Sequence, residues 1–337
     1  MASATVKNLG AAAKDVLPLY YRILSKFPQN LTFCFAYGSA VKPQIGNQNK
    51  QNMIDLIFCV DNSHRWHAAN IEQNPSHYSA LRFLGKSFVT RFQENWGAKV
   101  YFNTLVEIKE ENVMIKYGVV SQKDLVTDLL DWNDLYLAGR LHKPVEIIKK
   151  TNSSQLQNAI QSNLRSAVHT ALLILPETFS EYDFYFAISN LSYAGDFRMT
   201  FGENKNKVRN IVQPQLLHFR ELFKPVLQQF NAYVDIPTGE AQCHQDLNPE
   251  TKLHHLMQLP MVPQRKIVKF WNRGGLQQDM EDVLRAVAYD IDCAIILRQI
   301  LKDIVWQSSV RQSLKGILTA GVLKSIRYSA NKIAKMF

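Results

Sequence analysis

The chain is poor in cysteine and has no long uninterrupted apolar run. Its four cysteines among 337 residues show neither metal-type spacing nor the density of a disulfide-stabilised small domain, so we expect a reducing compartment. The most apolar stretch, residues 286–305, contains several charges, whereas a membrane-spanning helix needs about 20 predominantly apolar residues. Those charges are Asp290, Asp292, Arg298, Lys302 and Asp303. We therefore expect a soluble or peripheral protein rather than one that spans a membrane.

Internal repeats, low-complexity tracts and recognised RNA-binding modules are also missing from the sequence. The hydrophobic content of 46% is that of an ordinary globular protein, and 337 residues suffice for two domains. The formal net charge of +10 indicates an anionic partner. Composition leaves this partner open among nucleic acid, a nucleotide and an acidic membrane surface.

The most informative segment joins two apolar runs through a glycine–serine turn. The first run leads into Tyr37, Gly38 and Ser39, and the second, residues 53–58, carries Asp55. Glycine lets the backbone approach a phosphate, and successive N–H groups can form an anion-binding nest to which a serine hydroxyl adds a donor. A carboxylate inside an apolar strand is costly unless it is paired or binds a metal. The segment therefore predicts the phosphate-and-metal half of a nucleotidyltransferase site, with Mg²⁺ on Asp55.

The chain divides into three predicted parts, and the predicted fold class is α+β. Residues 1–148 alternate strand and helix signals, with further strands expected at 99–106 and 114–120, and they close at a Gly- and Pro-containing boundary. Residues 149–305 have mainly helical patterning. Residues 306–337 form a basic amphipathic segment, in which Gly316 and Gly321 are expected to separate two short helices.

The end of the chain, from residue 308 on, is basic and contains no acid. On a helical wheel one apolar sector holds Val322, Ile326, Ala330, Ile333 and Phe337. Outside this sector lie Lys324, Arg327, Lys332 and Lys335. Such a pattern is typical of a helix on an anionic bilayer surface, and also of a terminal helix docked on its own domain.

A series of segments along the chain recurs in the order of one known family. They are FAYGS (35–39), MID (53–55), WH (66–67), KYGV (116–119), LAGRLHKP (137–144), YAGDFRM (193–199), GEN (202–204) and SLKGILTAG (313–321). In this ordered set the chain resembles the mitochondrial translocator assembly and maintenance protein family, the mitochondrial phosphatidate cytidylyltransferases or CDP-diacylglycerol synthases. The resemblance covers nearly the whole chain.

The resemblance implies a reaction, a cofactor and a location. The reaction is CTP + phosphatidate → CDP-diacylglycerol + pyrophosphate, which depends on Mg²⁺ and lies upstream of cardiolipin. The implied partners are CTP, phosphatidic acid and an anionic membrane surface reached through the C-terminal helix, with no nucleic acid. The implied location is peripheral, on the matrix side of the mitochondrial inner membrane. The first part of the chain is expected to be a polymerase-beta-type nucleotidyltransferase domain, followed by the mainly helical domain.

The phosphatidate oxygen is already anionic near neutral pH, because the second pKa of a phosphomonoester is about 6. A strong general base is therefore not required, and positioning and charge neutralisation should dominate the catalysis. We assign Asp55 and Lys116 to catalysis, and the nucleotide contacts to Tyr37, Gly38, Ser39 and Arg198. Lys116 can also be interpreted as an ordinary exposed strand lysine.

One position departs from the polymerase-beta-type pattern. Such enzymes usually carry two acids in alternation on this strand, but the first position here is Met53. Asp61 shares the strand face, yet at about 3.3 Å per residue it lies about 20 Å from Asp55. We expect further metal ligands from Asp196 and Glu203, while Glu107 and Asp128 stay open as alternatives.

Two further groups have both a functional and a purely structural interpretation. Trp66 and His67 could contact the cytosine or glycerol region of a substrate, but such a pair commonly packs in a core. The basic residues Arg140, His142 and Lys143 could bind phosphate, or could stabilise the end of the preceding helix.

A zinc site is not expected. Cys243-His244 and His254-His255 suggest one superficially, but their spacing matches no common zinc motif.

Two other functions compete with lipid cytidylyl transfer. A nucleotidyltransferase with an RNA or small-molecule acceptor would also suit the +10 charge and the Gly–Ser turn. A non-catalytic membrane adaptor is suggested by the basic C-terminal segment together with the missing carboxylate at Met53. An assay with labelled CTP and phosphatidate separates all three.

Overall fold

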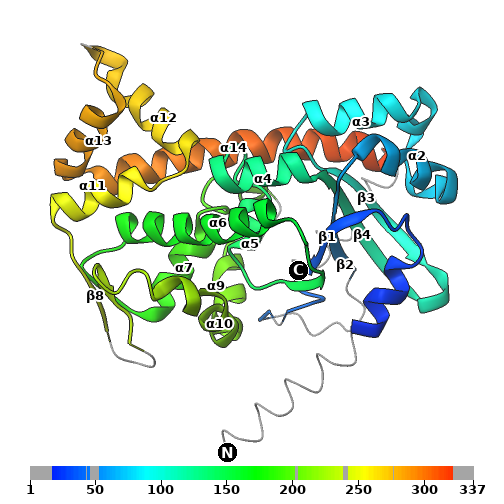
Figure 1. The fold of residues 1–337 in the computed structure, drawn as a ribbon, viewed down its shortest axis with the longest axis horizontal. Helices are drawn as coiled ribbons and strands as arrows, with labels where there is room; N and C mark the ends of the chain where they lie inside the picture. The colour runs from blue at the N-terminus through cyan, green and yellow to red at the C-terminus, as the bar shows by residue number, and fades with distance from the viewer. Residues whose placement is uncertain are drawn as a thin grey trace, which may run out of the picture.

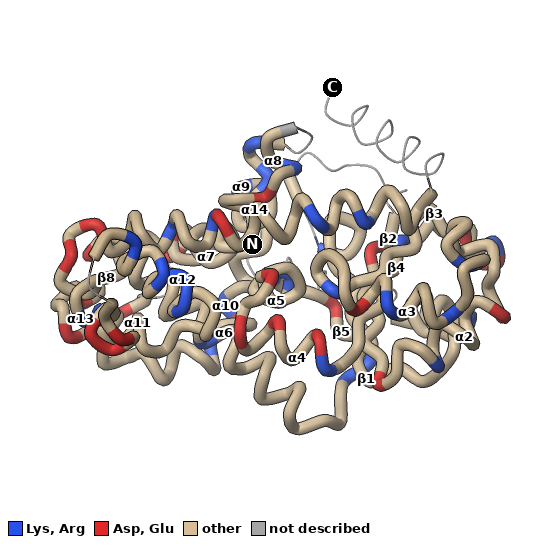
Figure 2. Tube along the Cα trace, turned by 90° about the horizontal axis from the view of Figure 1, so that it is seen from above, with Lys and Arg blue, Asp and Glu red and all other residues tan. Residues whose placement is uncertain are grey.

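The computed structural model of the chain describes residues 17–42, 44–45, 53–201, 204–237, 242–275 and 277–321. The structure is mixed α+β, as predicted. A five-stranded sheet lies at one end of the molecule, the helices α11 to α13 lie at the other, and the long helix α14 connects the two ends (Figures 1 and 2). The bounds of these helices are Pro249–Met257 (α11), Met261–Trp271 (α12), Met280–Tyr289 (α13) and Cys293–Ala320 (α14).

The five-stranded sheet contains all the strands predicted in the first part of the chain. Its members are β1 (Leu31–Tyr37), β2 (Ile54–Val60), β3 (Tyr101–Ile108), β4 (Val113–Ser121) and β5 (Glu146–Lys149), in the order β3-β4-β2-β1-β5. β2 and β4 are parallel, and the other neighbouring strands are antiparallel. The turn after β1 and the start of β2 are therefore at the same edge of the sheet as the start of β4.

Both faces of the two central strands are buried, because alternate side chains enter two separate cores. Phe35 and Ile57 belong to the core shared with the helical half of the molecule. Ala36 and Phe58 belong to a second core, which is covered by a helix over residues 17–24 and by α2. Burial on both faces explains why these strands are almost continuously apolar. It also makes Asp55 an exception within β2.

The remaining elements of the sheet end are short helices. They are α2 (Ser63–Gln73), η1 (Pro75–His77), η2 (Ala80–Leu84), α3 (Lys86–Asn95) and η3 (Lys109–Glu111). The helical half contains α4 (Gln122–Asp131), α5 (Ala138–Leu141), α6 (Ser154–Ile174), α7 (Glu181–Asn190), α8 (Arg198–Phe201), α9 (Lys207–Val212), η4 (Gln213–Gln215), α10 (Leu216–Leu227) and η5 (Asn272–Gly274). A small sheet, β6-β8-β7, joins Thr178–Phe179, Cys243–Gln245 and Val234–Asp235.

Helix α14 differs from the sequence-based expectation. It runs without interruption through residue 305 and through Gly316, and it ends at Gly321, where φ is +81°. The prediction of a helix break at Gly316 is therefore wrong. Apart from the helix's own backbone, no heavy atom of the described residues would lie within 4 Å of a Cβ at Gly316, so this residue lies on a face of the helix that the described residues leave open.

Part of the predicted membrane segment belongs to the core. The Lys315 ammonium is 1% exposed and donates to the carbonyls of Gln93 at 2.8 Å and Trp96 at 2.7 Å. The Gln312 side chain accepts from the Ala98 N–H at 2.9 Å. Residues 306–320 thus attach α14 to the sheet end, and the amphipathic stretch 322–337 lies outside the described residues. In the part of the chain that the structure describes, no helix is long and apolar enough to cross a membrane.

Candidate active site

The turn after β1 needs a glycine for two reasons. Gly38 has a φ of +88°, in the left-handed region that side chains rarely adopt, and a Cβ there would lie 3.2 Å from Asp55 Oδ2. The Gly38 carbonyl accepts from the N–H groups of Val41 at 3.1 Å and Lys42 at 3.0 Å, which curls the chain after the turn. Ser39 follows directly and is half-buried. The turn is therefore held against the Asp55 carboxylate.

The sheet register brings the predicted catalytic pair together. Asp55 is paired with Tyr37 of β1 on one side and with Lys116 of β4 on the other. The Lys116 Nζ lies 3.8 Å from Asp55 Oδ1, and the two side chains are 14% and 25% exposed. The same ammonium lies 4.7 Å from the centre of the Phe102 ring. Lys116 is thus a half-buried partner of Asp55 rather than an exposed strand lysine.

Arg140 is the main functional candidate whose role could not be assigned from the sequence. Its guanidinium lies 4.6 Å from the ring centres of both Tyr37 and Tyr136. Arg140 Nε and Tyr37 Oη are buried and have no hydrogen-bond partner among the described residues. Buried polar atoms are normally paired, so unpaired ones at one place indicate a ligand that completes them. A phosphate group has the acceptor oxygens that both atoms need.

The position of Arg140 depends on a buried carboxylate. Asp128 of α4 accepts from four backbone N–H groups of the following loop, at 2.8 to 3.2 Å. The helix ends at Trp132, whose φ is +56°, and the loop then leads into α5. Asp128 was an open alternative for a metal ligand, but its oxygens hold this loop instead. Its role is to place Tyr136 and Arg140.

Asp196 and Arg198 lie on a turn that packs closely against α14. The Arg198 Nε donates to Asp196 Oδ1 at 2.9 Å, and the backbone N–H of Phe197 donates to Ser309 Oγ at 2.9 Å. Although burial raises the pKa of the Asp196 carboxyl, the hydrogen bonds and charge of Arg198 hold it below its ordinary value. Asp196 is therefore an ionised partner of Arg198. Glu203 lies outside the described residues.

Lys143 extends the basic surface from α5 toward this turn. Its ammonium donates to the Gly139 carbonyl and to Ser192 Oγ, the latter at 2.9 Å, and lies 4.9 Å from the Tyr193 ring centre. Burial and the positive charge of Arg140 lower the pKa of Lys143 to about 7, while the negative charge of Asp196 opposes this shift. Lys143 therefore changes its charge near neutral pH.

The pKa of the Tyr136 hydroxyl reflects the combined charge of the site. Burial alone would raise its pKa, but the positive charges of Arg140, Arg198 and Lys116 hold it below the ordinary value. These three cations come from α5, α8 and β4, which are distant in sequence. The sheet end and the helical half thus bring three cations to one half-buried site, where two of them pair with Asp55 and Asp196, and such a site is suited to binding an anion.

Asp55 is the predicted metal ligand that the structure places at the β1–β2 turn. In the part of the chain that the structure describes, Asp55 forms no group of three potential ligands with Asp196, Asp128 or Glu107. Glu107 is exposed on β3. The predicted site residues that the structure brings together around the β1–β2 turn are Tyr37, Gly38, Ser39, Asp55 and Lys116. Arg198 belongs to the same site because its charge lowers the pKa of the Tyr136 hydroxyl.

Three other side chains singled out from the sequence are structural. His67 is fully buried, and its ring nitrogens lie 2.8 Å from Tyr78 Oη and 2.8 Å from Gln93 Oε1. Trp66 is 2% exposed and donates to the Pro28 carbonyl. His142 is also fully buried, 2.9 Å from Asn163 Oδ1. These side chains pack in the cores, so only Arg140 and Lys143 of the predicted basic cluster face the site.

The turn that carries Asp196 and Arg198 gives a stability prediction. Gly195→Ala would place a Cβ 2.1 Å from the Lys302 carbonyl oxygen, a backbone atom of α14. Overpacking of this kind costs about 1–3 kcal/mol, and we expect the upper end because backbone must move. Urea unfolding measures the loss. In Gly274→Ala no described heavy atom lies within 4 Å of the new Cβ, so this control should change by less than about 0.5 kcal/mol. Equal stability of the two variants would contradict the close packing of the turn.

Comparison with known proteins identifies the family. The family described as "Phosphatidate cytidylyltransferase, mitochondrial" matches residues 20–335. A relative of that name from Danio rerio is 45% identical over 329 residues, covering 97% of this chain and 96% of the relative. The protein of that name from Mus musculus is 46% identical over 318 residues, covering 94% of each chain, and the one from Schizosaccharomyces pombe is 37% identical over 334 residues, covering 93% and 82%. The chain therefore belongs to the mitochondrial phosphatidate cytidylyltransferase family.

Proposed function

We propose that this chain transfers the cytidylyl group of CTP to phosphatidate and releases pyrophosphate. The observation that carries the proposal is the convergence of Lys116, Arg140 and Arg198 beside Asp55 and the Gly38 turn. Both substrates are phosphate anions, and the names of the relatives specify a cytidylyl transfer to phosphatidate. The product would be CDP-diacylglycerol, which feeds cardiolipin synthesis.

We propose a polymerase-beta-type nucleotidyltransferase domain at the sheet end. Support comes from the antiparallel pair β1–β2, the tight turn at Gly38, and an acid on the second strand facing that turn. The departure at Met53 stays, because in the described part of the chain Asp55 belongs to no group of three potential metal ligands.

Mg²⁺ is the proposed cofactor, and the residues present fit it. Asp55 offers carboxylate oxygens at a half-buried position beside the phosphate-binding turn. Mg²⁺ is commonly held by one or two carboxylates together with substrate phosphates, so a single protein acid is sufficient. When bound, Mg²⁺ supplies positive charge to the phosphates. Asp196 and Glu203 stay proposals as further ligands, and Asp196 would first have to leave Arg198.

The chain's own residues act by positioning and charge. An oxygen of the phosphatidate phosphate forms a bond to the α-phosphorus of CTP, and the bond from that phosphorus to the bridging oxygen breaks as pyrophosphate leaves. Gly38 and Ser39 hold the triphosphate, and the rings of Tyr37 and Tyr136 position the Arg140 guanidinium beside it. Lys116 and Arg198 neutralise the charge that moves onto the leaving group. No side chain needs to remove a proton, since the attacking oxygen is already ionised.

The direct test is an assay with CTP labelled at the α-phosphorus and vesicles that contain phosphatidate. Formation of labelled CDP-diacylglycerol supports the proposal. CTP binding without that product would favour a different acceptor, such as an RNA or a small molecule. Absence of nucleotide binding would favour the membrane adaptor.

A pH series gives a separate prediction for Lys143. Because its pKa is lowered to about 7, the side chain is a cation below that pH and loses its charge above it. The wild-type chain should therefore bind CTP more tightly than Lys143→Gln below pH 7, and the two affinities should converge as the pH rises through the pKa. Calorimetric titration across this range measures the ratio of the two Kd values. A ratio that does not change with pH would show that the Lys143 charge does not contact the nucleotide.

We also propose peripheral attachment to the matrix side of the mitochondrial inner membrane. The relatives are named as mitochondrial proteins. The basic amphipathic pattern of residues 322–337 supports contact with an anionic lipid surface. Such attachment would bring the soluble nucleotide and the membrane-embedded phosphatidate to one site.

A further inference from the structure

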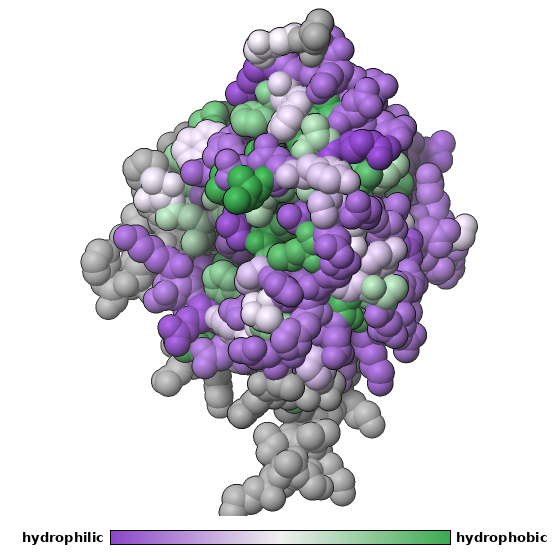
Figure 3. All heavy atoms as spheres, turned by 90° about the vertical axis from the view of Figure 1, so that its left-hand side faces the viewer, coloured by the Kyte–Doolittle hydropathy of each residue, from purple (hydrophilic) through white to green (hydrophobic). Residues whose placement is uncertain are grey.

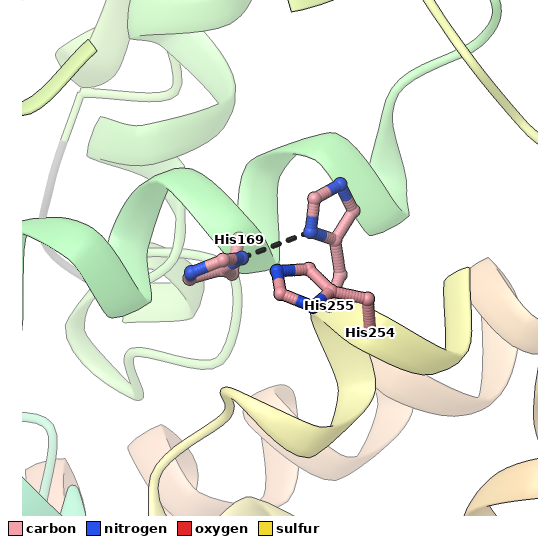
Figure 4. Close-up of side chains that lie close together, drawn as sticks. All are labelled: His169, His254 and His255. Atoms are coloured by element: carbon pink, nitrogen blue, oxygen red, sulfur yellow. Dashed lines mark hydrogen bonds between the residues drawn. The ribbon is translucent and has the colours of Figure 1, made fainter. Parts of the chain in front are cut away.

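Three histidines meet at the end of the molecule opposite the candidate active site. His169 lies on α6, and His254 and His255 are adjacent on α11. One ring nitrogen from each residue lies within 4.8 Å of those from the other two, and Figure 4 shows the three imidazoles converging between the two helices. From the sequence alone a zinc site was not expected here, because the spacing of Cys243-His244 and His254-His255 matches no common zinc motif. The third member, His169, comes from a distant helix.

Two of the three rings are held at close range. The Nδ1 atoms of His169 and His255 lie 2.9 Å apart, so one ring donates a proton to the other. Both residues are buried. In a hydrogen-bonded pair of imidazoles one Nδ1 atom accepts and therefore carries a lone pair, which is the form of ring nitrogen that binds a metal.

The surrounding side chains fix the rings without occupying all their nitrogens. The Tyr233 ring stacks on His254 with centres 4.6 Å apart, and the Phe230 ring lies 4.6 Å from that of His169. His255 Nε2 is buried and has no hydrogen-bond partner within the described residues. Of the charged groups that act on the cluster, Arg165 faces His169 and Asp246 faces His255. The three imidazoles therefore form a polar site that is flanked by aromatic side chains.

We propose that His169, His254 and His255 bind one divalent transition-metal ion of the zinc type, which ties α6 to α11. Two nitrogens on a tetrahedral zinc, each about 2.0–2.1 Å from the metal, lie about 3.3 Å apart. The 2.9 Å separation of the His169 and His255 nitrogens needs to open only slightly, and His254 needs to turn inward. His254 is half-buried, so a fourth ligand such as water can reach the ion from solvent. Three imidazoles suit Zn²⁺ and its neighbours in the first transition row rather than Mg²⁺.

This site is separate from the catalytic one. Helix α11 lies at the far end of the molecule from β1, β2 and β4 (Figures 1 and 2). The surface at the α11–α13 end is mainly hydrophilic with scattered apolar side chains (Figure 3). A metal there would stabilise the helical half, because an ion that binds the folded chain and not the unfolded one raises its stability. Cytidylyl transfer does not require it.

The test uses Zn²⁺ and the full chain. Bound metal is first removed from the protein with a chelator. The protein is then equilibrated with Zn²⁺ in the presence of excess Mg²⁺, which keeps Zn²⁺ from carboxylate sites, and is passed through a desalting column. We expect about one retained zinc ion per chain by mass spectrometry, as for a three-histidine site. Zinc should raise the Tm, and Co²⁺ in its place should give the strong visible absorption of a tetrahedral site. The Co²⁺ spectrum tests the proposal without any variant.

Two variants locate the ion. His254→Gln removes the least buried ligand, and His244→Gln removes an exposed histidine of β8 that is outside the cluster. We expect zinc affinity to fall at least about tenfold in His254→Gln, because loss even of outer partners of metal ligands costs 10- to 100-fold. His244→Gln should bind as the wild type does. Absence of zinc and of the Co²⁺ bands in the wild type, or unchanged affinity in a folded His254→Gln, would overturn the proposal.

Discussion

Asp55→Asn is expected to lower kcat for CDP-diacylglycerol formation by about 10³-fold or more, the scale of removing a central electrostatic group. Asp55 supplies a carboxylate that lies beside both Gly38 and Lys116. Asparagine keeps the shape, so the contact with Gly38 and the fold should survive. It removes the negative charge that would hold Mg²⁺ and that now pairs with Lys116. Initial rates at saturating CTP and phosphatidate measure the loss.

The control for this variant is Asp61→Asn. Asp61 directly follows β2 and is exposed, so the same chemical change there should leave kcat within about twofold, as for ordinary surface substitutions. Both variants should keep the circular dichroism spectrum and the Tm of the wild type. Near-normal turnover in a folded Asp55→Asn would remove Asp55 from the catalytic role and would reopen the search for the metal site.

The β1–turn–β2 unit could be predicted from the sequence because its information is local. Alternating side chains on two apolar strands fill two cores, and the turn between them requires a glycine at Gly38. An acid in such a strand is easily recognised because the apolar side chains around it cannot form an ion pair or a hydrogen bond with it. The parallel register of β2 and β4 places Lys116 Nζ 3.8 Å from Asp55 Oδ1, although the sequence did not predict this pair, and the catalytic roles of both residues stay predictions. That register is set by the sheet as a whole and not by either segment.

The role of Arg140 could not be assigned because it depends on contacts that the sequence does not display. The loop before α5 is held by the Asp128 carboxylate, which accepts from backbone N–H groups that any residue provides. A sequence signal did exist, since Tyr136 and Arg140 are four residues apart beside a Gly. Only the folded chain brings the ring of the distant Tyr37 to the same guanidinium.

The error at α14 has a similar cause. Gly316 lowers local helix propensity by about 1 kcal/mol relative to alanine, which favours a break when the segment is considered alone. In the structure the buried side chains of Gln312 and Lys315 bind backbone groups of residues 93–100 and hold the helix across the glycine. Tertiary contacts thus outweigh propensity. The histidine cluster escaped prediction for the same reason, because His169 and His255 are 86 residues apart.

Arg140→Lys is expected to lower kcat/KM for CTP by about 10²-fold, even though the positive charge is kept. The guanidinium lies 4.6 Å from the centres of both the Tyr37 and Tyr136 rings, and its Nε has no hydrogen-bond partner among the described residues. Lysine has neither the plane nor the fork of donors, so it cannot stack on both rings and contact a phosphate. The KM for phosphatidate should change little, and inhibition by pyrophosphate should weaken together with CTP use.

The matched substitution is Arg285→Lys, on an exposed face of α13, where the arginine pairs only with Glu281 among the described residues. It should leave both KM values and the Tm unchanged. A fall in phosphatidate use with normal pyrophosphate inhibition in Arg140→Lys would move this residue to the lipid phosphate. Unchanged kinetics for both substrates would contradict the inference from the two unpaired atoms. Tyr37 belongs to the sheet end, and Tyr136 lies just before α5 of the helical half. A loss of CTP use in Arg140→Lys would therefore support a nucleotide site to which both halves of the molecule contribute.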